Sequence, residues 1–325
     1  MKSARAALAL SVLVALLSTA HATTETHWNL QAVDVNGVST WAGSLPLTVT
    51  GVLLNDPAEM LDSTWDPDAN ASGTMGGQWQ VFIQGVDGDR LGTALWMGQN
   101  YNSLGPWIPA GNAYDEGTWN DEIDRLSHDP TNGHRFTKGD LVTVTANESR
   151  FYGGKQNINE AHSTSPDNDF SIELVHAGYG LPDAEVLALA DLYASTDAAD
   201  YDATYPMFDA SRNTGAEHYQ GMYVRLNGLT LTDAAGWGQS AWGARLCKAS
   251  DGLGRSLNLR MPLTDLGPAP TGTFDAYGII NQESGSGNNG RMGYELFVTE
   301  IVPEPASLSL LALGALACLR RRRNI

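Results

Sequence analysis

Short runs of alternating apolar and polar residues recur along most of the chain, separated by Gly, Asn, Asp and Pro. Such runs, enriched in β-branched and aromatic residues, are typical of half-buried strands. The pattern predicts ten strands in two sets of five. The first set lies near residues 46–54, 78–86, 92–98, 140–147 and 170–176, and the second near 221–231, 242–247, 255–263, 272–280 and 294–301.

Sets of five short strands with bulge-prone glycines predict small closed barrels, because closure removes exposed strand edges. We therefore expect a mainly β fold with two five-stranded barrels in tandem, and a two-sheet sandwich remains the alternative. Between the sets, Pro182–Ser195 predicts a short helix with Pro182 in its first turn. The apolar positions of 224–231 share no period-two register, which predicts a bulge near Asn227 and Gly228.

The N-terminus has the three-part pattern of a secretory signal peptide. Lys2 and Arg5 precede an apolar run over 6–17, and small residues occupy the −3 and −1 positions of a cleavage site after Ala22. We expect a signal helix over residues 1–22 that signal peptidase removes during export.

The C-terminal residues 302–325 combine a Pro-Glu-Pro step, an apolar stretch and a basic cluster. The apolar stretch over 306–319 predicts a hydrophobic helix of about 21 Å, which is short for a bilayer core of about 30 Å. The arginines at the end of this helix predict that its C-terminal end stays on the cytoplasmic side of the membrane. The residues that carry these features are Pro303, Glu304 and Pro305, and Arg320, Arg321, Arg322 and Arg323.

This layout resembles the PEP-CTERM sorting signal of Gram-negative bacteria. The resemblance implies recognition by an exosortase, transient residence in the inner membrane, removal of the tail, and delivery to the outer surface or extracellular matrix. A plain tail anchor is the alternative.

Composition limits the partners of the remaining body of about 280 residues, a length sufficient for one large or two modest domains. Trimming both ends leaves 13 Lys and Arg against 36 Asp and Glu, so the formal net charge changes from −18 to −23. Such a charge disfavours non-specific binding to nucleic acid. Cys247 is the single cysteine left in the body, so no intramolecular disulfide is expected.

A second resemblance concerns the body. The segment Glu217–Val224 and the strands near 46–54, 78–86 and 140–147 resemble OB-like regions that accompany secreted bacterial nucleases. Gln220 stands where that pattern has Glu, and the chain lacks the residues of a nuclease domain. The resemblance implies two OB-like barrels without the activity. The expected domains are a signal peptide (1–22), a first OB-like domain (23–180) with a long loop insertion (99–138), a linker with a short helix (181–216), a second OB-like domain (217–301) and the sorting signal (302–325).

Two acidic loops are candidate metal sites. Asp66, Asp68 and Asn70 alternate in a loop and offer the oxygen ligands that calcium prefers, although an acidic solvated turn is the alternative. A second loop combines imidazoles with carboxylates, as transition-metal sites do, but matches no known spacing. Its members are Asp121, Glu122, Asp124, His128, Asp129 and His134.

Aromatic residues are numerous, and exposed ones could stack on bases or sugars, but we expect most to pack in the core. They are Trp79, Phe82, Trp96, Tyr101, Trp107, Trp119, Trp237 and Trp242. We find no nucleophile elbow, phosphate loop or paired-cysteine pattern.

We therefore expect a non-catalytic cell-envelope or matrix protein that acts as a binding or structural module. Its expected partners, besides signal peptidase and exosortase, are an extracellular polysaccharide or another envelope protein, and no cofactor is expected except calcium. One alternative is an accessory binder of extracellular nucleic acid or polysaccharide, with a basic strip at Arg245, Lys248, Arg255 and Arg260. The other is a hydrolase with an unrecognised site in the 99–138 insertion.

Overall fold

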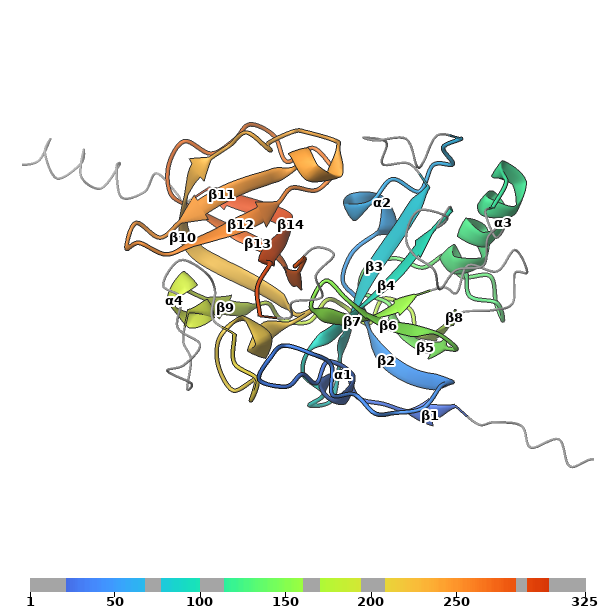
Figure 1. Cartoon of the computed structure of the whole chain (residues 1–325). Helices are drawn as coiled ribbons and strands as arrows, with labels where there is room; N and C mark the ends of the chain where they lie inside the picture. Colours follow the sequence, from blue (N-terminus) through green and yellow to red (C-terminus); the bar gives the residue numbers. More distant parts are fainter. Residues whose placement is uncertain are drawn as a thin grey trace, which may run out of the picture.

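The computed structural model describes residues 22–67, 77–99, 114–159, 170–193, 208–284 and 291–303. The fold is mainly β with short helices, which confirms the predicted class (Figure 1). Nine of the ten predicted strands form where they were expected, and the one expected at 242–247 begins only at Leu246, because Trp242–Ala244 form a short 3-10 helix. The ten strands are β2 (Leu47–Leu53), β3 (Gln78–Gly85), β4 (Gly92–Gly98), β5 (Leu141–Ala146), β8 (Phe170–His176), β10 (Tyr223–Asp233), β11 (Leu246–Ser250), β12 (Ser256–Arg260), β13 (Phe274–Gln282) and β14 (Tyr294–Pro303).

The first half forms an eight-stranded sheet in the order β6-β7-β4-β3-β2-β5-β8, with β1 beside β2. Three short strands were not expected: β1 (Thr23–Thr24), β6 (Ser149–Tyr152) and β7 (Lys155–Asn159). β7 lies parallel to β4, whereas β8 lies antiparallel to β5. Within the described residues β7 and β8 do not pair with each other, so this sheet is an open path of strands and not a five-stranded ring.

The second half forms the predicted closed five-stranded barrel, in the cyclic order β10-β11-β12-β14-β13. β10 closes it, because its first residues pair with β13 and its last residues pair with β11. The predicted bulge is present, since the β10–β13 register shifts between Leu226 and Leu229. Gly228 lies in that bulge at a φ of 67°, a backbone conformation that favours glycine.

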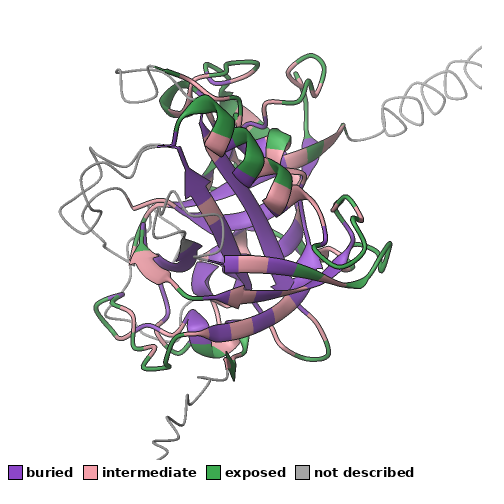
Figure 2. Ribbon diagram, turned by 90° about the vertical axis from the view of Figure 1, so that its right-hand side faces the viewer, coloured by how far each residue is buried: buried purple, intermediate pink, exposed green. Residues whose placement is uncertain are grey.

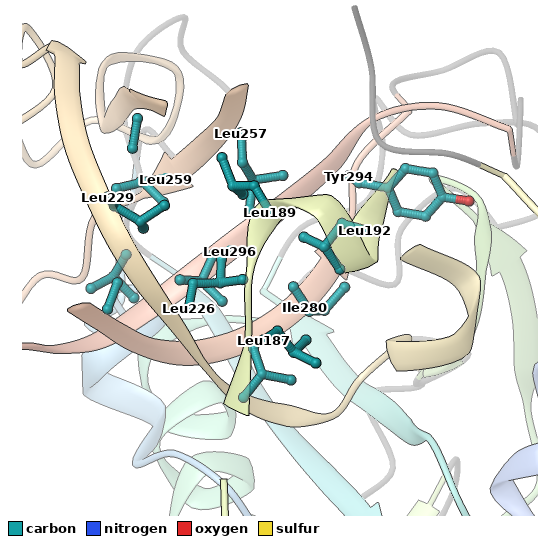
Figure 3. Packing of buried hydrophobic residues seen from close by; sticks show 14 of the residues in the cluster. Leu187, Leu189, Leu192, Leu226, Leu229, Leu257, Leu259, Ile280, Tyr294 and Leu296 are labelled. Carbon is teal, nitrogen blue, oxygen red and sulfur yellow. The ribbon is translucent and has the colours of Figure 1, made fainter. Parts of the chain in front are cut away.

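The segment between the two halves is more than a linker. Within its described residues, Leu189–Leu192 form a helix (α4), and Glu185–Leu187 form strand β9, parallel to β10. The predicted short helix is therefore present, but it begins at Leu189, and the predicted start at Pro182 is wrong. Leu187, Leu189 and Leu192 explain the difference, because the strand and the short helix together place all three in the barrel core (Figure 3).

Each half has its own buried core. The central strands that face the viewer in Figure 2 are largely buried, whereas the loops around them are mostly exposed. In the first half, one face of the sheet packs on α3 (Glu116–Ser127), whose Trp119 is fully buried. Asp115 caps α3, because its carboxylate accepts a hydrogen bond from the Thr118 amide at 2.8 Å. The helix lies in the predicted insertion, which is thus partly structured. None of the described helices is long and apolar enough to cross a membrane.

A third apolar cluster, here called the shared core, joins the two halves. Its buried members are Leu54, Met60, Leu61, Phe82 and Ala94 from the first half, and Tyr223, Ile279 and Phe297 from the barrel. The rings of Phe82 and Phe297 meet edge to face, with centroids 5.5 Å apart. Short helices at the edges of the first half are α1 (His27–Leu30) and α2 (Pro57–Met60), the latter contributing Met60. The expected domain boundaries stay a prediction. The two halves also bury apolar side chains against each other in the shared core.

Candidate functional site

A pocket of about 310 Å³ lies at one end of the barrel, between two connecting loops. Residues 237–240, from the β10–β11 connection, form one wall, and residues 261–267, from the β12–β13 connection, form the other. Met261 and Pro262 are buried, whereas Gln239, Ser240, Thr264 and Asp265 are exposed. The pocket therefore combines an apolar base with a polar, solvent-facing rim.

A hydrogen bond joins the two walls, since the Trp237 indole N–H donates to the Gly267 carbonyl at 2.8 Å. Within the second wall, Asp265 accepts from the Gly267 amide at 2.8 Å. Below the pocket, the fully buried Arg245 guanidinium donates to the Met261 carbonyl at 3.0 Å and to the Met60 carbonyl at 2.7 Å. The pocket is thus anchored both to the barrel and to α2 of the first half.

The rim of the pocket is polar, with one acidic residue. Its rim offers an amide, two hydroxyls and one carboxylate, and Trp237 offers a ring edge. None of its lining residues is basic, so phosphates and other anions have no counter-charge there. Asp265 is its one ionisable side chain, which leaves no partner for acid–base catalysis among the lining residues.

The predicted basic strip does not form a surface. Arg245 and Arg260 are 1% and 4% exposed, and Arg260 pairs with buried Glu295 at 2.9 Å. Arg255 pairs with Asp251 at 2.6 Å, which leaves Lys248 as the exposed member without an ion pair among the described residues. The guanidinium of Arg260 lies over the Trp242 ring, 3.9 Å from its centroid, inside the interface. The four residues were grouped by their nearness in the sequence, but Arg245 and Arg260 are buried.

The candidate calcium loop is only partly visible. Asp66 is described, and its backbone N–H and C=O both bond the Gln99 side-chain amide, the former at 2.8 Å. Asp68 and Asn70 lie outside the described residues, so this site stays a prediction. Within the described residues no group of three or more His, Cys, Asp and Glu side chains lies close enough to hold a metal ion.

His128 Nδ1 lies 3.2 Å from Asp124 Oδ1, but the other described acidic and histidine residues of the insertion that have side-chain partners bond groups outside this set. Glu122 is buried and pairs with Arg125 at 2.7 Å. Asp129 accepts hydrogen bonds from three backbone amides, including that of Leu174 at 2.6 Å, and these bonds lower the pKa of its carboxyl. His134 bonds Asp140 at 2.8 Å. The candidate transition-metal and hydrolase sites therefore gain no support from this loop.

The aromatic residues mostly pack as expected. Trp79, Phe82 and Trp119 are buried, while Trp96, Trp237 and Trp242 are partly buried against the cores. Tyr101 and Trp107 lie outside the described residues. Trp237 is the member of this group that lines the pocket, and the pattern alone did not separate it from the others.

Sequence reasoning missed a buried carboxyl in the motif near 217–224. Glu217 is 1% exposed, and the Tyr294 hydroxyl donates a 2.5 Å hydrogen bond to it. Burial raises the pKa of Glu217 to about 8, although Arg212 and Tyr294 oppose the shift. Arg212 itself stacks on Trp28 of α1, 3.9 Å from the ring centroid, so the motif binds the barrel to the first half. The burial of Glu217 could not be predicted, because the sequence around a glutamate does not show whether its side chain is buried.

The two expected processing sites lie at the edges of the folded body. Ala22 directly precedes β1, and the Thr23 amide donates to the Pro46 carbonyl at 2.9 Å. Pro303 is the last residue of β14 and lies opposite Phe274. Glu304, Pro305 and Arg320–Arg323 lie outside the described residues.

Comparison with known families and proteins supports the tail alone. The PEP-CTERM protein-sorting motif matches residues 302–323, which confirms the sorting resemblance and supports an exported protein processed by exosortase. No curated protein matches the chain. The chain is therefore similar to exosortase substrates over its C-terminal residues. For the body, the fold and the pocket are the observations from which a function is argued.

Proposed function

We propose that this protein is a non-catalytic binding module of the cell surface or extracellular matrix, with the barrel-end pocket as its ligand site. The observation that carries the proposal is the pocket, which has an apolar base, a polar rim with one carboxylate and no basic residue, on a body that carries an exosortase tail. The exported destination brings it among extracellular polysaccharides and envelope proteins.

The barrel supports an OB-like assignment. Its third strand (β12) lies parallel to its fifth (β14), and its first (β10) pairs with both the second and the fourth. OB-like barrels bind oligosaccharides and oligonucleotides with the loop between their first two strands. In this barrel that loop carries Trp237, Gln239 and Ser240, which line the pocket.

The ligand that fits best is a neutral saccharide unit. Hydroxyl-rich rings hydrogen-bond amides, hydroxyls and carboxylates, and their apolar faces pack on aromatic and aliphatic side chains. An oligonucleotide fits less well, because the lining lacks cations and the body carries a formal charge of about −23 after trimming.

The test is a titration of the processed protein with a soluble neutral glucan and, separately, with single-stranded DNA. Replacing both Gln239 and Ser240 with Ala should weaken glucan binding about tenfold or more, since two ligand hydrogen bonds are lost. Asn258→Ala is the matched control, because this amide is exposed on β12 outside the pocket, and it should leave the affinity unchanged.

Two results would contradict the proposal. Glucan binding that survives the double substitution would remove the pocket from the site. Binding of DNA that weakens steeply with salt, without binding of glucan, would favour the nucleic-acid alternative.

A further inference from the structure

A buried lysine, glutamate and asparagine meet where the first half packs against the barrel. Lys155 begins β7, while Asn281 and Glu283 lie at the end of β13. One oxygen of Glu283, Oε1, accepts from Lys155 Nζ at 2.9 Å and from Asn281 Nδ2 at 3.4 Å. Lys155 Nζ also donates to the backbone carbonyl of Gln282 at 2.6 Å.

Lys155 and Asn281 are removed from water, and Glu283 is partly buried. Lys155 is 3% exposed, Asn281 is fully buried, and the Glu283 side chain is 21% exposed. Among the described residues, no group donates a hydrogen bond to Asn281 Oδ1. An unpaired buried carbonyl and a buried lysine both cost free energy, and an ion pair alone leaves that carbonyl unsatisfied.

Hydrogen bonds to the backbone hold the segment around Lys155 in place next to the end of β13. The Ser284 amide donates to the Gly153 carbonyl at 3.0 Å, which ties the β6–β7 turn to the end of β13. The residue after Lys155, Gln156, exchanges hydrogen bonds of 2.8 and 2.9 Å with the Gln31 side chain of the first half. Lys155 Nζ is therefore held at the same carboxylate oxygen that Asn281 Nδ2 contacts, which limits the conformational freedom that the two groups must lose on reacting.

We propose that Lys155 and Asn281 form an intramolecular isopeptide bond that joins the first half of the chain to the barrel. In this step Glu283 takes a proton from the Lys155 ammonium, and the neutral Nζ attacks Asn281 Cγ. An amide bond forms between Nζ and Cγ and the Cγ–Nδ2 bond breaks. Glu283 returns the first proton to Nδ2 and then relays the second proton of Nζ to the departing ammonia, which leaves as ammonium. The products are the secondary amide and ammonium, and nothing is oxidised or reduced.

The surroundings suit both proton transfers. Glu283 already contacts the nitrogen that must lose a proton and the nitrogen that must gain one, as general acid–base catalysis requires. Asn281 Nδ2 also donates to Glu295 Oε1 at 3.2 Å, and burial raises the pKa of that carboxyl. The cross-link would supply a covalent tie in an exported body whose single cysteine excludes an internal disulfide.

Tryptic peptide mapping of the purified, folded protein tests the bond. Trypsin cannot cleave after a modified Lys155, so the expected product is a branched peptide of residues 151–212 joined to residues 261–291. Its mass should be the sum of the two peptides less one ammonia, and its fragmentation should place the branch at Lys155 and Asn281.

The variants separate chemistry from folding. Lys155→Arg keeps the charge but cannot form the amide, and Glu283→Gln keeps the size but cannot relay the proton, so both should yield unbranched peptides. Lys138→Arg is the matched control, because Lys138 also pairs with a glutamate, Glu59, at 2.8 Å, and this variant should retain the branch.

Separate peptides 151–155 and 261–291 from the folded wild-type protein would overturn the proposal. Loss of ammonia from 261–291 alone would overturn it too, because an asparagine that cyclises on its own backbone loses the same mass. A branch that persists in Glu283→Gln would remove Glu283 from the chemistry.

Discussion

Gly228 shows how one backbone angle closes the barrel. Its positive φ lets β10 bulge, so that the strand can leave β13 and pair with β11. A Cβ at this position would meet no atom within 4 Å, and a substitution therefore acts through the backbone alone. We expect Gly228→Val to destabilise the protein by about 1–3 kcal/mol, because a β-branched residue is strained at this φ.

A denaturant melt of the whole chain measures this effect. Gly243→Val is the matched control, since Gly243 also has open space around its Cβ but does not have a positive φ. Equal melting midpoints for the two variants would mean that the bulge does not depend on glycine.

Glu217 predicts a stability that falls as the pH rises. Its carboxyl has an ordinary pKa of 4.5 in the unfolded chain and about 8 in the fold, so the folded state holds the proton more tightly. The contribution of protonated Glu217 to the free energy of unfolding is fully present below pH 4.5 and is lost as the pH rises to about 8. We expect Glu217→Gln to flatten this fall, because the amide stays neutral and still accepts from Tyr294.

Thermal melts of both proteins between pH 5 and pH 9 check the prediction. Asp209 and Arg212 flank Glu217 and are present in both proteins, so the difference between the two curves reports Glu217 alone. A parallel decline of the two melting temperatures would show that another group is responsible.

Among the elements, alternation was enough to locate the ten main strands, because each has one face on a core and β-branched or aromatic residues along it. It could not find β7 or β9. Lys155–Asn159 lack an alternating apolar pattern, and their long-range partners are more than 100 residues away: Gln31 bonds the backbone of Gln156, and Glu283 bonds the Lys155 side chain. The helix expected over 182–195 begins only at Leu189, because β10 offers Glu185–Leu187 an edge to pair with. The pocket was equally invisible, as its two walls come from separate loops.

The strand β9 and the helix α4 predict which barrel fragment folds. Leu187, Leu189 and Leu192 are buried in the barrel core, so a fragment of residues 214–303 loses part of that core (Figure 3). We expect a fragment of residues 182–303 to be more stable than the shorter one by about 2–5 kcal/mol, the cost of emptying such a core site. Circular dichroism during a urea titration compares them.

Both fragments should still bind hydrophobic dyes, because Tyr223, Ile279 and Phe297 would lose their cover from the first half. A shorter fragment as stable as the longer one would return residues 182–193 to the role of a plain linker.

At the scale of the whole molecule, the tail meets the fold without a spacer. The sorting motif matches from residue 302, and Pro303 is still paired in β14. Replacing Pro303, Glu304 and Pro305 with Ala should leave a membrane-retained species with an intact tail, because the motif is lost while β14 is not. Cell fractionation and the mass of the C-terminal peptide measure the outcome. A native exported protein that still carries Arg320–Arg323 would contradict the sorting assignment.

The position of Pro303 also has a mechanical consequence. While the tail is held in a membrane, any pull on the body enters at the end of β14 and runs along that strand. β14 lies between β12 and β13, so the pull loads two ladders of hydrogen bonds in shear, and those bonds must fail together. A body tethered at this end therefore withstands tension through the barrel until the tail is cut.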